Sequence, residues 1–154
     1  PRNIFFPLKS LKLRIPEFRS WFLSLLKNGK SKCERKVGLQ GVAGSDPKDS
    51  EIGEMIVKIL KDSKESMDMR EKAAYALSDF PYQPARMTLI QILEGKISEG
   101  NIRAACLKAL GNIGRREDIA LLKKAIKRDK YGTGGFEGST ARKSIRKIKK
   151  RFKK

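Results

Sequence analysis

The stretch "NIRAACLKALGNIGRREDIALLKKAIKRD", residues 101–129, decides the fold class of this chain. Apolar side chains recur in it at helical spacing, first from Ile102 to Ile113 and again from Leu122 to Ile126. A short acidic turn separates the two runs. The stretch therefore predicts two helices connected by a tight turn, and strand-like alternation is absent from it.

The same pattern occurs twice more, at an offset of 33 residues. The positions that superpose are Ile56, Leu89 and Leu122; Leu60, Leu93 and Ile126; Arg70 and Arg103; Ala76 and Ala109; Leu77 and Leu110; Phe80 and Ile113. A repeat of this length built from two helices is typical of an α-solenoid. We therefore expect an all-α fold, a short solenoid whose repeat domain covers residues 50–154 with three antiparallel helix pairs over 51–153. The side chains expected between its layers are Leu77, Leu89, Leu93, Leu110, Leu122 and Ile126.

The repeat resembles a HEAT-like repeat of the phycobilin-lyase-related type. The matching residues are Ile102, Arg103, Ala105, Ala109, Leu110, Gly111, Ile113, Gly114, Glu117, Asp118, Leu122 and Ile126. The preceding unit matches at Met69, Arg70, Ala73, Ala76 and Leu77, whereas Ser78 and Pro81 replace the glycines. The resemblance covers residues 51–154 and implies a solenoid, but it does not imply one function, because such repeats serve many partners.

Residues 1–49 have no repeat match and are expected to form a basic N-terminal arm. Pro7 and Pro16 exclude one continuous helix at its start, so residues 1–16 are expected to be extended and held by a partner. An amphipathic helix is predicted over 17–28, with a stripe made by Phe18, Trp21, Phe22 and Leu25. A basic, glycine-containing linker is expected to follow, up to residue 49.

The net charge of +19 is large for 154 residues and is concentrated at the two ends of the chain. Residues 1–40 hold ten basic and two acidic side chains, and residues 100–154 hold eighteen and four. The middle, residues 41–99, has eight basic and eleven acidic side chains. Such a charge costs stability through self-repulsion unless a polyanion neutralises it, so the distribution favours binding to nucleic acid, or to an anionic membrane.

The closing stretch "STARKSIRKIKKRFKK", residues 139–154, is predicted to be the last helix. Ala141, Ile145, Ile148 and Phe152 form its apolar stripe, and basic side chains fill the rest of its surface. A glycine-rich loop with aromatic residues is expected before it, over 130–139. The residues predicted to contact nucleic acid are Arg2, Lys9, Lys12, Arg14, Arg115, Arg116, Lys130, Tyr131, Arg142, Lys143, Arg146, Lys147, Lys150, Arg151 and Lys154.

These features favour a non-catalytic scaffold that binds nucleic acid, such as ribosomal RNA in a large RNA–protein particle, with ribosomal proteins as further partners. Three alternatives stay open: an adaptor for an acidic protein, attachment to a membrane through residues 17–28, and a glycosylase that grips DNA with HEAT-like repeats. The glycosylase is disfavoured because the only tryptophan, Trp21, lies outside the repeats and no cluster of acidic and aromatic residues occurs. A steep fall of binding with salt distinguishes nucleic acid from the protein partner.

Other chemistry is disfavoured by the composition. Histidine-based catalysis is excluded because the chain has no histidine, and its two cysteines, Cys33 and Cys106, are too isolated to suggest a disulfide framework or a zinc site. Cys106 is expected to be a small buried thiol. We expect no metal, no cofactor and no small-molecule substrate. The absence of a long apolar run or a secretory signal favours a cytoplasmic location.

Overall fold

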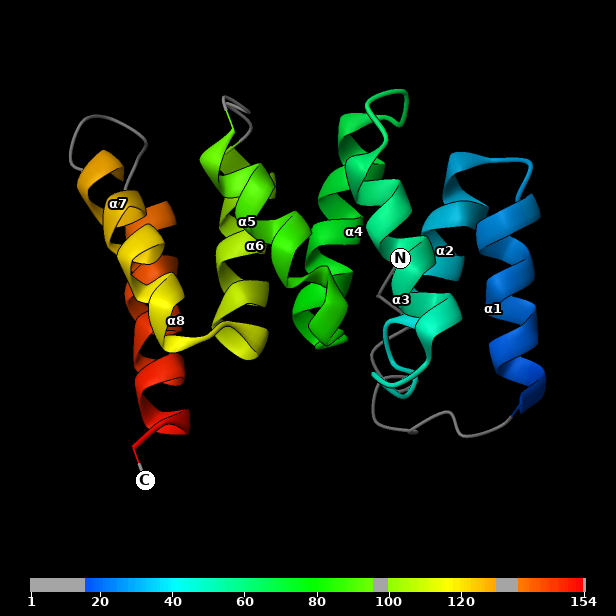
Figure 1. Cartoon of the computed structure of the whole chain (residues 1–154). Coiled ribbons are helices and arrows are strands. Elements are labelled where there is room, and N and C mark those ends of the chain that lie inside the picture. The colour runs from blue at the N-terminus through cyan, green and yellow to red at the C-terminus, as the bar shows by residue number, and fades with distance from the viewer. Residues whose placement is uncertain (1–15, 96–99, 130–135, 154) are drawn as a thin grey trace, which may run out of the picture.

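A computed structural model describes residues 16–95, 100–129 and 136–153, and all regular elements in these ranges are helices (Figure 1). The α-helices are α1 (Pro16–Asn28), α2 (Lys32–Val42), α3 (Ser50–Lys61), α4 (Met67–Asp79), α5 (Arg86–Glu94), α6 (Gly100–Ile113), α7 (Ile119–Asp129) and α8 (Phe136–Arg151). Two short 3-10 helices, η1 (Gln83–Ala85) and η2 (Arg116–Asp118), lead into α5 and α7. The all-α class and the solenoid are confirmed.

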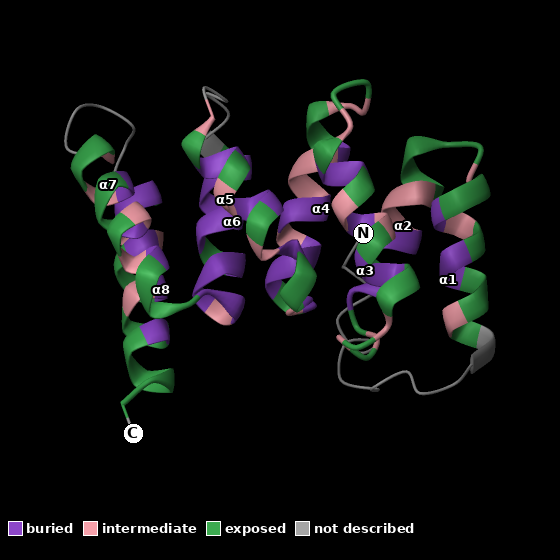
Figure 2. Ribbon diagram, in the orientation of Figure 1, coloured by how far each residue is buried: buried purple, intermediate pink, exposed green. Residues whose placement is uncertain are grey.

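The helices form antiparallel pairs that stack side by side along the array (Figure 1). The pairs α3–α4, α5–α6 and α7–α8 are those expected from the repeat. The even-numbered helices contact one another in order, α2 with α4, α4 with α6 and α6 with α8, and form one layer. The odd-numbered helices form the other layer, and buried residues, purple in Figure 2, occur on helices of both layers.

A single hydrophobic core runs from Phe22 in α1 to Ile148 in α8. Leu77, Leu89, Leu93, Leu110 and Leu122 are buried in it, as predicted from the repeat. Ile126 of α7 is only half-buried and packs against the edge of this core. The 33-residue period therefore identified the core with one partial exception.

The prediction of a linker between residues 29 and 49 was wrong, since α2 occupies most of it. Ser31 and Glu34 form a capping box at the start of α2. Gly41 faces the ring of Phe22, and a Cβ at this position would overlap the ring. The glycine that resembled a flexible linker instead allows α1 and α2 to approach closely, so that they form a further pair at the N-terminal end.

Helix α1 confirms the helix expected over 17–28, but the predicted stripe does not coincide with the buried face. Phe22 is buried together with Leu23 and Leu26, whereas Phe18 and Trp21 are 39% and 52% exposed. Leu25 is half-buried. Because α2 and α3 cover adjoining faces of α1, the buried face is rotated relative to the stripe.

The last helix begins earlier than predicted and ends before the chain does. It covers Phe136–Arg151, so residues 136–139 of the expected glycine-rich loop are helical. Gly138 is buried in this first turn and lies against Asp129 of α7. Phe152 follows the helix and is 36% exposed, so its expected place in the buried stripe was also wrong.

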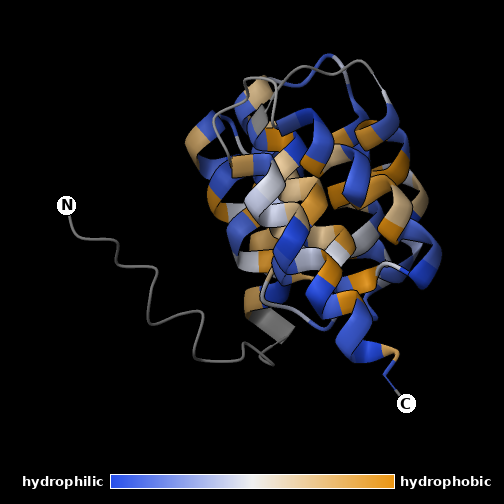
Figure 3. Ribbon diagram, turned by 90° about the vertical axis from the view of Figure 1, so that its left-hand side faces the viewer, coloured by the Kyte–Doolittle hydropathy of each residue, from blue (hydrophilic) through white to orange (hydrophobic). Residues whose placement is uncertain are grey.

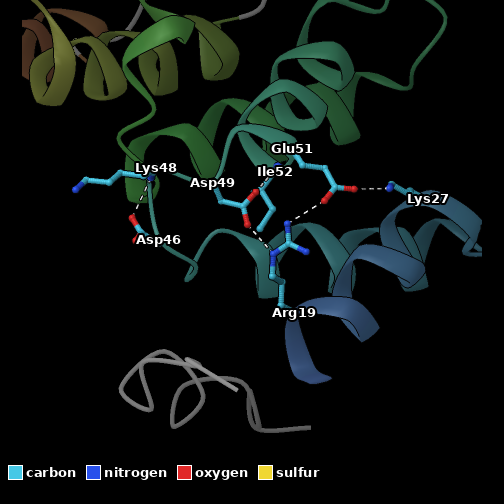
Figure 4. Close-up of polar contacts among 7 residues, drawn as sticks. All are labelled: Arg19, Lys27, Asp46, Lys48, Asp49, Glu51 and Ile52. Carbon is cyan, nitrogen blue, oxygen red and sulfur yellow. Dashed lines mark hydrogen bonds and ion pairs between the residues drawn. The ribbon is translucent and has the colours of Figure 1, made fainter. Parts of the chain in front are cut away.

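Arginine–carboxylate pairs connect neighbouring odd-numbered helices at two junctions of the array. The Nε atom of Arg19 in α1 lies 2.6 Å from Oδ2 of Asp49, the N-cap of α3, and its Nη2 lies 2.9 Å from Oε2 of Glu51 (Figure 4). At the junction of α5 with α7, Nη2 of Arg86 lies 2.6 Å from Oδ1 of Asp118, in the 3-10 helix that leads into α7. At the middle junction Gly53 occupies the place of the arginine, and the ring of Tyr82 lies 2.5 Å from where a Cβ would be.

The ion pair between Arg19 and Asp49 should make the stability of the fold depend on pH in the acidic range. The hydrogen bond from Arg19 holds the pKa of Asp49 below its usual value, so the stabilisation is present above about pH 4 and is lost as the pH falls through the lower folded-state pKa. We expect Asp49→Asn, which keeps an N-cap residue, to flatten the dependence of the melting temperature on pH below about pH 4. Asp46→Asn is the control, because the Asp46 carboxylate accepts from the backbone nitrogen of Lys48 and has no ion pair within the described ranges (Figure 4). An equal slope in the Asp49 variant and the wild type would contradict the prediction.

Candidate nucleic-acid interface

The basic end of the chain is an integral helix of the array. Ala141, Ser144 and Ile148 are buried along one face of α8. Ser144 lies against Gly111 of α6, at 2.6 Å from where a Cβ would be. Helix α8 contacts both α6 and α7, so the cations on its remaining surface are presented from a fixed platform.

The first turn of α8 is held by a buried ion pair. Nε of Arg103 in α6 lies 3.3 Å from Oε1 of Glu137, and each side chain is 4% exposed. Arg103 also donates from Nη1 to the carbonyl of Leu93 in α5, at 3.0 Å. One arginine therefore connects α5, α6 and α8.

The last turn of α8 is held by two of the residues predicted to bind phosphate. Arg151 donates from Nη1 to the carbonyl of Asn112 and from Nη2, at 2.5 Å, to that of Gly114, at the end of α6. Arg116 donates to the carbonyl of Phe152. The ring of Phe152 lies 5.8 Å and 5.6 Å from the guanidinium carbons of Arg116 and Arg151. Arg116 and Arg151 thus secure the end of the helix, which their sequence positions did not reveal.

The exposed charged side chains of α8 are all basic. Arg142, Lys143, Arg146 and Lys150 are exposed, and no carboxylate among the described residues pairs with them. Lys147 donates to the side chain of Asn112 at 2.9 Å and so faces α6. By the helical period, Arg142 and Arg146 lie on the opposite flank, at the end of the array.

Helix α7 adds cations that the sequence analysis did not include. Lys123, Lys124, Lys127 and Arg128 are exposed and lack an ion pair within the part of the chain that the structure describes. The helical period could have revealed these four residues, because it places them away from the apolar Leu122 and Ala125, and both of these are buried. Lys149 on α8 is exposed as well and was also not among the predicted contacts. Figure 3 shows the array from this end, with the C-terminus at its lower right.

We define the cationic end as the exposed basic residues of α7 and α8 other than Arg151: Lys123, Lys124, Lys127, Arg128, Arg142, Lys143, Arg146, Lys147, Lys149 and Lys150. Arg115 is exposed at the start of η2, beside this surface. The other predicted contacts, Arg2, Lys9, Lys12, Arg14, Lys130, Tyr131 and Lys154, lie outside the described residues, as does the arm over 1–15.

Metal binding and thiol chemistry depend on where the cysteine and acidic side chains of the described residues lie. They contain no group of three or more cysteine, aspartate and glutamate side chains that could hold a metal ion. Cys33 is exposed, whereas Cys106 is buried as expected. Burial raises the pKa of the Cys106 thiol to about 12, so it is protonated at neutral pH.

The stacked pairs, the buried leucines at a fixed period and the repeated arginine contacts agree with a comparison against known families. A model of HEAT repeats matches residues 53–133, which is more than half of the chain. The chain belongs to the HEAT-repeat family. No curated protein and no solved structure matches it.

The matched part of this HEAT protein extends from α3 to just beyond α7. Helices α1, α2 and α8 lie outside the match but continue the same packing and share the same core. HEAT repeats form helical scaffolds and adaptors. In the described ranges, no helix is long and apolar enough to span a bilayer.

Proposed function

We propose that this HEAT protein is a non-catalytic scaffold that binds nucleic acid, with ribosomal RNA in a large RNA–protein particle as the target. The cationic end carries the interaction. The observation that supports this proposal is the row of unpaired cations on α7 and α8, which is held rigid by Arg103, Glu137 and Arg151.

The charge pattern favours a polyanion over a protein partner with isolated carboxylates. Lys143 and Lys147, and likewise Arg146 and Lys150, are like charges four residues apart on one helix, which costs about a few tenths of a kcal/mol per pair in isolation. Release of counterions from a phosphate backbone more than offsets this cost. Because the surface offers charge without a set of amide side chains for base edges, affinity is electrostatic and shape-dependent.

The proposal predicts a steep salt dependence. If about six cations contact phosphates, the log–log slope of affinity against salt is about −4 to −5, from about 0.7–0.9 per contact. We expect replacement of Arg142, Lys143, Arg146 and Lys150 by glutamine to reduce the magnitude of this slope by about 3. The measurement is fluorescence anisotropy of a labelled ribosomal RNA fragment over a range of salt concentrations, with circular dichroism to confirm the fold.

The matched control replaces Lys58, Lys61 and Lys64 by glutamine, because these residues are exposed on and after α3 and are far from the cationic end. The control should keep the wild-type slope. An unchanged slope in the α8 variant, with the fold intact, would contradict the nucleic-acid proposal. Equal binding to polyglutamate would instead favour the second candidate, an adaptor for an acidic protein, which the HEAT family membership supports.

The assignment to a particle needs a separate measurement. Sedimentation of an extract from cells that express the protein should place it with ribosomal particles at low salt, and high salt should release it. Migration only as a free protein at low salt would rule out a ribosomal target while leaving binding to other nucleic acids open.

A further inference from the structure

The two ends of the array differ in a way that the cationic end does not explain. On α1, Phe18 is 39% exposed and Trp21 is 52% exposed. Half-buried Leu25 continues the same flank, since the spacing of 18, 21 and 25 places the three side chains along one side of the helix. Arg19 and Lys27, which contact α3, lie on the other side. The apolar flank, defined as Phe18, Trp21 and Leu25, therefore faces away from the array.

The repeat register shows what this flank corresponds to. Offsets of 34, 33 and 33 residues superpose α1 on α3, α5 and α7, and they place Arg19 on Gly53 and Arg86. The residues at the positions of Phe18, Trp21 and Leu25 are Ile52, Met55 and Ile59; Ala85, Thr88 and Ile92; Asp118, Leu121 and Ala125. All of them are buried or half-buried. In α7 this flank faces the preceding pair, since Asp118 contacts Arg86 of α5, and Leu121 and Ala125 line one cavity with Leu93 and Leu107.

The opposite end of the array is closed to such stacking. Leu23 of α1 is buried in the core, and Val57 and Ile90, which occupy its register position in α3 and α5, pack against that core. In α7 this position is Lys123, which is exposed. A polar outer face is typical of a terminal repeat that receives no neighbour. Head-to-tail stacking of a second copy would bury these cations against the apolar flank, so the cationic end is not its partner.

We propose that the apolar flank of α1 is the docking site for an amphipathic helix hairpin of a protein partner. The hairpin lies on α1 in the way that the α1–α2 pair lies on α3. It presents leucine-like residues at the positions of Leu23 and Leu26, and Arg or Lys at the positions of Arg19 and Lys27. The basic positions are assigned from the contact of α1 with α3, in which Arg19 and Lys27 donate to Glu51. By sequence alone, residue 17 has the register position of Glu51 and is likewise a glutamate.

Trp21 is the only tryptophan of the chain and therefore reports on this flank directly. The probe is a peptide of residues 16–45, the α1–α2 hairpin, with Trp21→Phe so that it does not emit. We expect the peptide to shift the emission of the full chain to shorter wavelength in a saturable way. Phe18→Ser in the full chain should weaken binding about tenfold or more. Met87→Ser, which alters a 56% exposed side chain on α5, should leave binding unchanged.

A second measurement covers the case in which the peptide does not fold alone. Residues 16–49, which span one repeat from the start of α1 to the start of α3, are duplicated directly before Pro16 in the full chain. The duplicated pair should raise the denaturation midpoint relative to the same protein with Phe18→Ser in the second copy of α1, because each added repeat contributes an interface.

Three outcomes would overturn the proposal. One is the absence of both the emission shift and the stability gain. Another is a concentration-dependent shift of the protein alone with a dimer in sedimentation, which would assign the flank to a second copy. The third is a shift with vesicles of anionic lipid but not with the peptide, which would assign the flank to a membrane surface. All three leave the salt dependence of the cationic end unaffected.

Discussion

Glu137→Met is expected to lower the free energy of unfolding by about 3–5 kcal/mol, because it leaves the charge of Arg103 buried without a partner. Both side chains are 4% exposed, so water cannot replace the lost carboxylate without opening the structure. Urea denaturation measures the change. Hydrogen exchange should also accelerate in the first turn of α8, since Glu137 connects this turn to α6.

The double variant Arg103→Met, Glu137→Met is the matched control. Removing both charges restores an apolar contact, so its cost should be far below the sum of the two single costs. A residual loss of about 1 kcal/mol remains, because the carbonyl of Leu93 loses the donor Nη1 of Arg103. A single-variant cost below about 1 kcal/mol would show that the ion pair is solvated and does not hold α8.

Leu110→Ala is expected to cost about 2–5 kcal/mol, by loss of transfer free energy and by the cavity left behind. Leu110 has 0% exposure near the C-terminal end of α6, which contacts α4, α5 and α8. A cavity there loosens the helix that carries the cationic end. Chemical denaturation at constant protein concentration tests this expectation.

Met87→Ala serves as the control for Leu110, because Met87 is 56% exposed on α5 and its truncation should change stability by less than about 0.5 kcal/mol. Equal costs for the two variants would mean that the buried leucines do not carry the stacking of the array.

The sequence predicted most of the core because its signal is periodic. A 33-residue offset superposes Leu77 on Leu110 and Leu89 on Leu122, and each of these side chains is buried. Helix α2 was missed because its glycines and charges resemble a linker when read alone. Gly41 becomes favourable in a helix only through contact with the ring of Phe22, which lies on another helix. Local composition contains no such information.

The candidate site was predicted less completely, for a related reason. Charge density identified α8, and Arg142, Lys143, Arg146 and Lys150 are exposed on it, whereas their contact with phosphates stays a prediction. It could not separate these residues from Arg151, whose guanidinium contacts carbonyls at the end of α6. Distinguishing an unpaired cation from a capping one requires the positions of groups distant in sequence.

The two cysteines of this chain offer a route to selective labelling without mutagenesis. Only the thiolate of a cysteine attacks a maleimide, and the buried Cys106, with a pKa of about 12, holds almost none of it at neutral pH. Cys33 is exposed at the start of α2, in the half of the array opposite to α7 and α8. A dye should therefore attach at one position, where it can report the rotational diffusion of complexes without occupying the cationic surface.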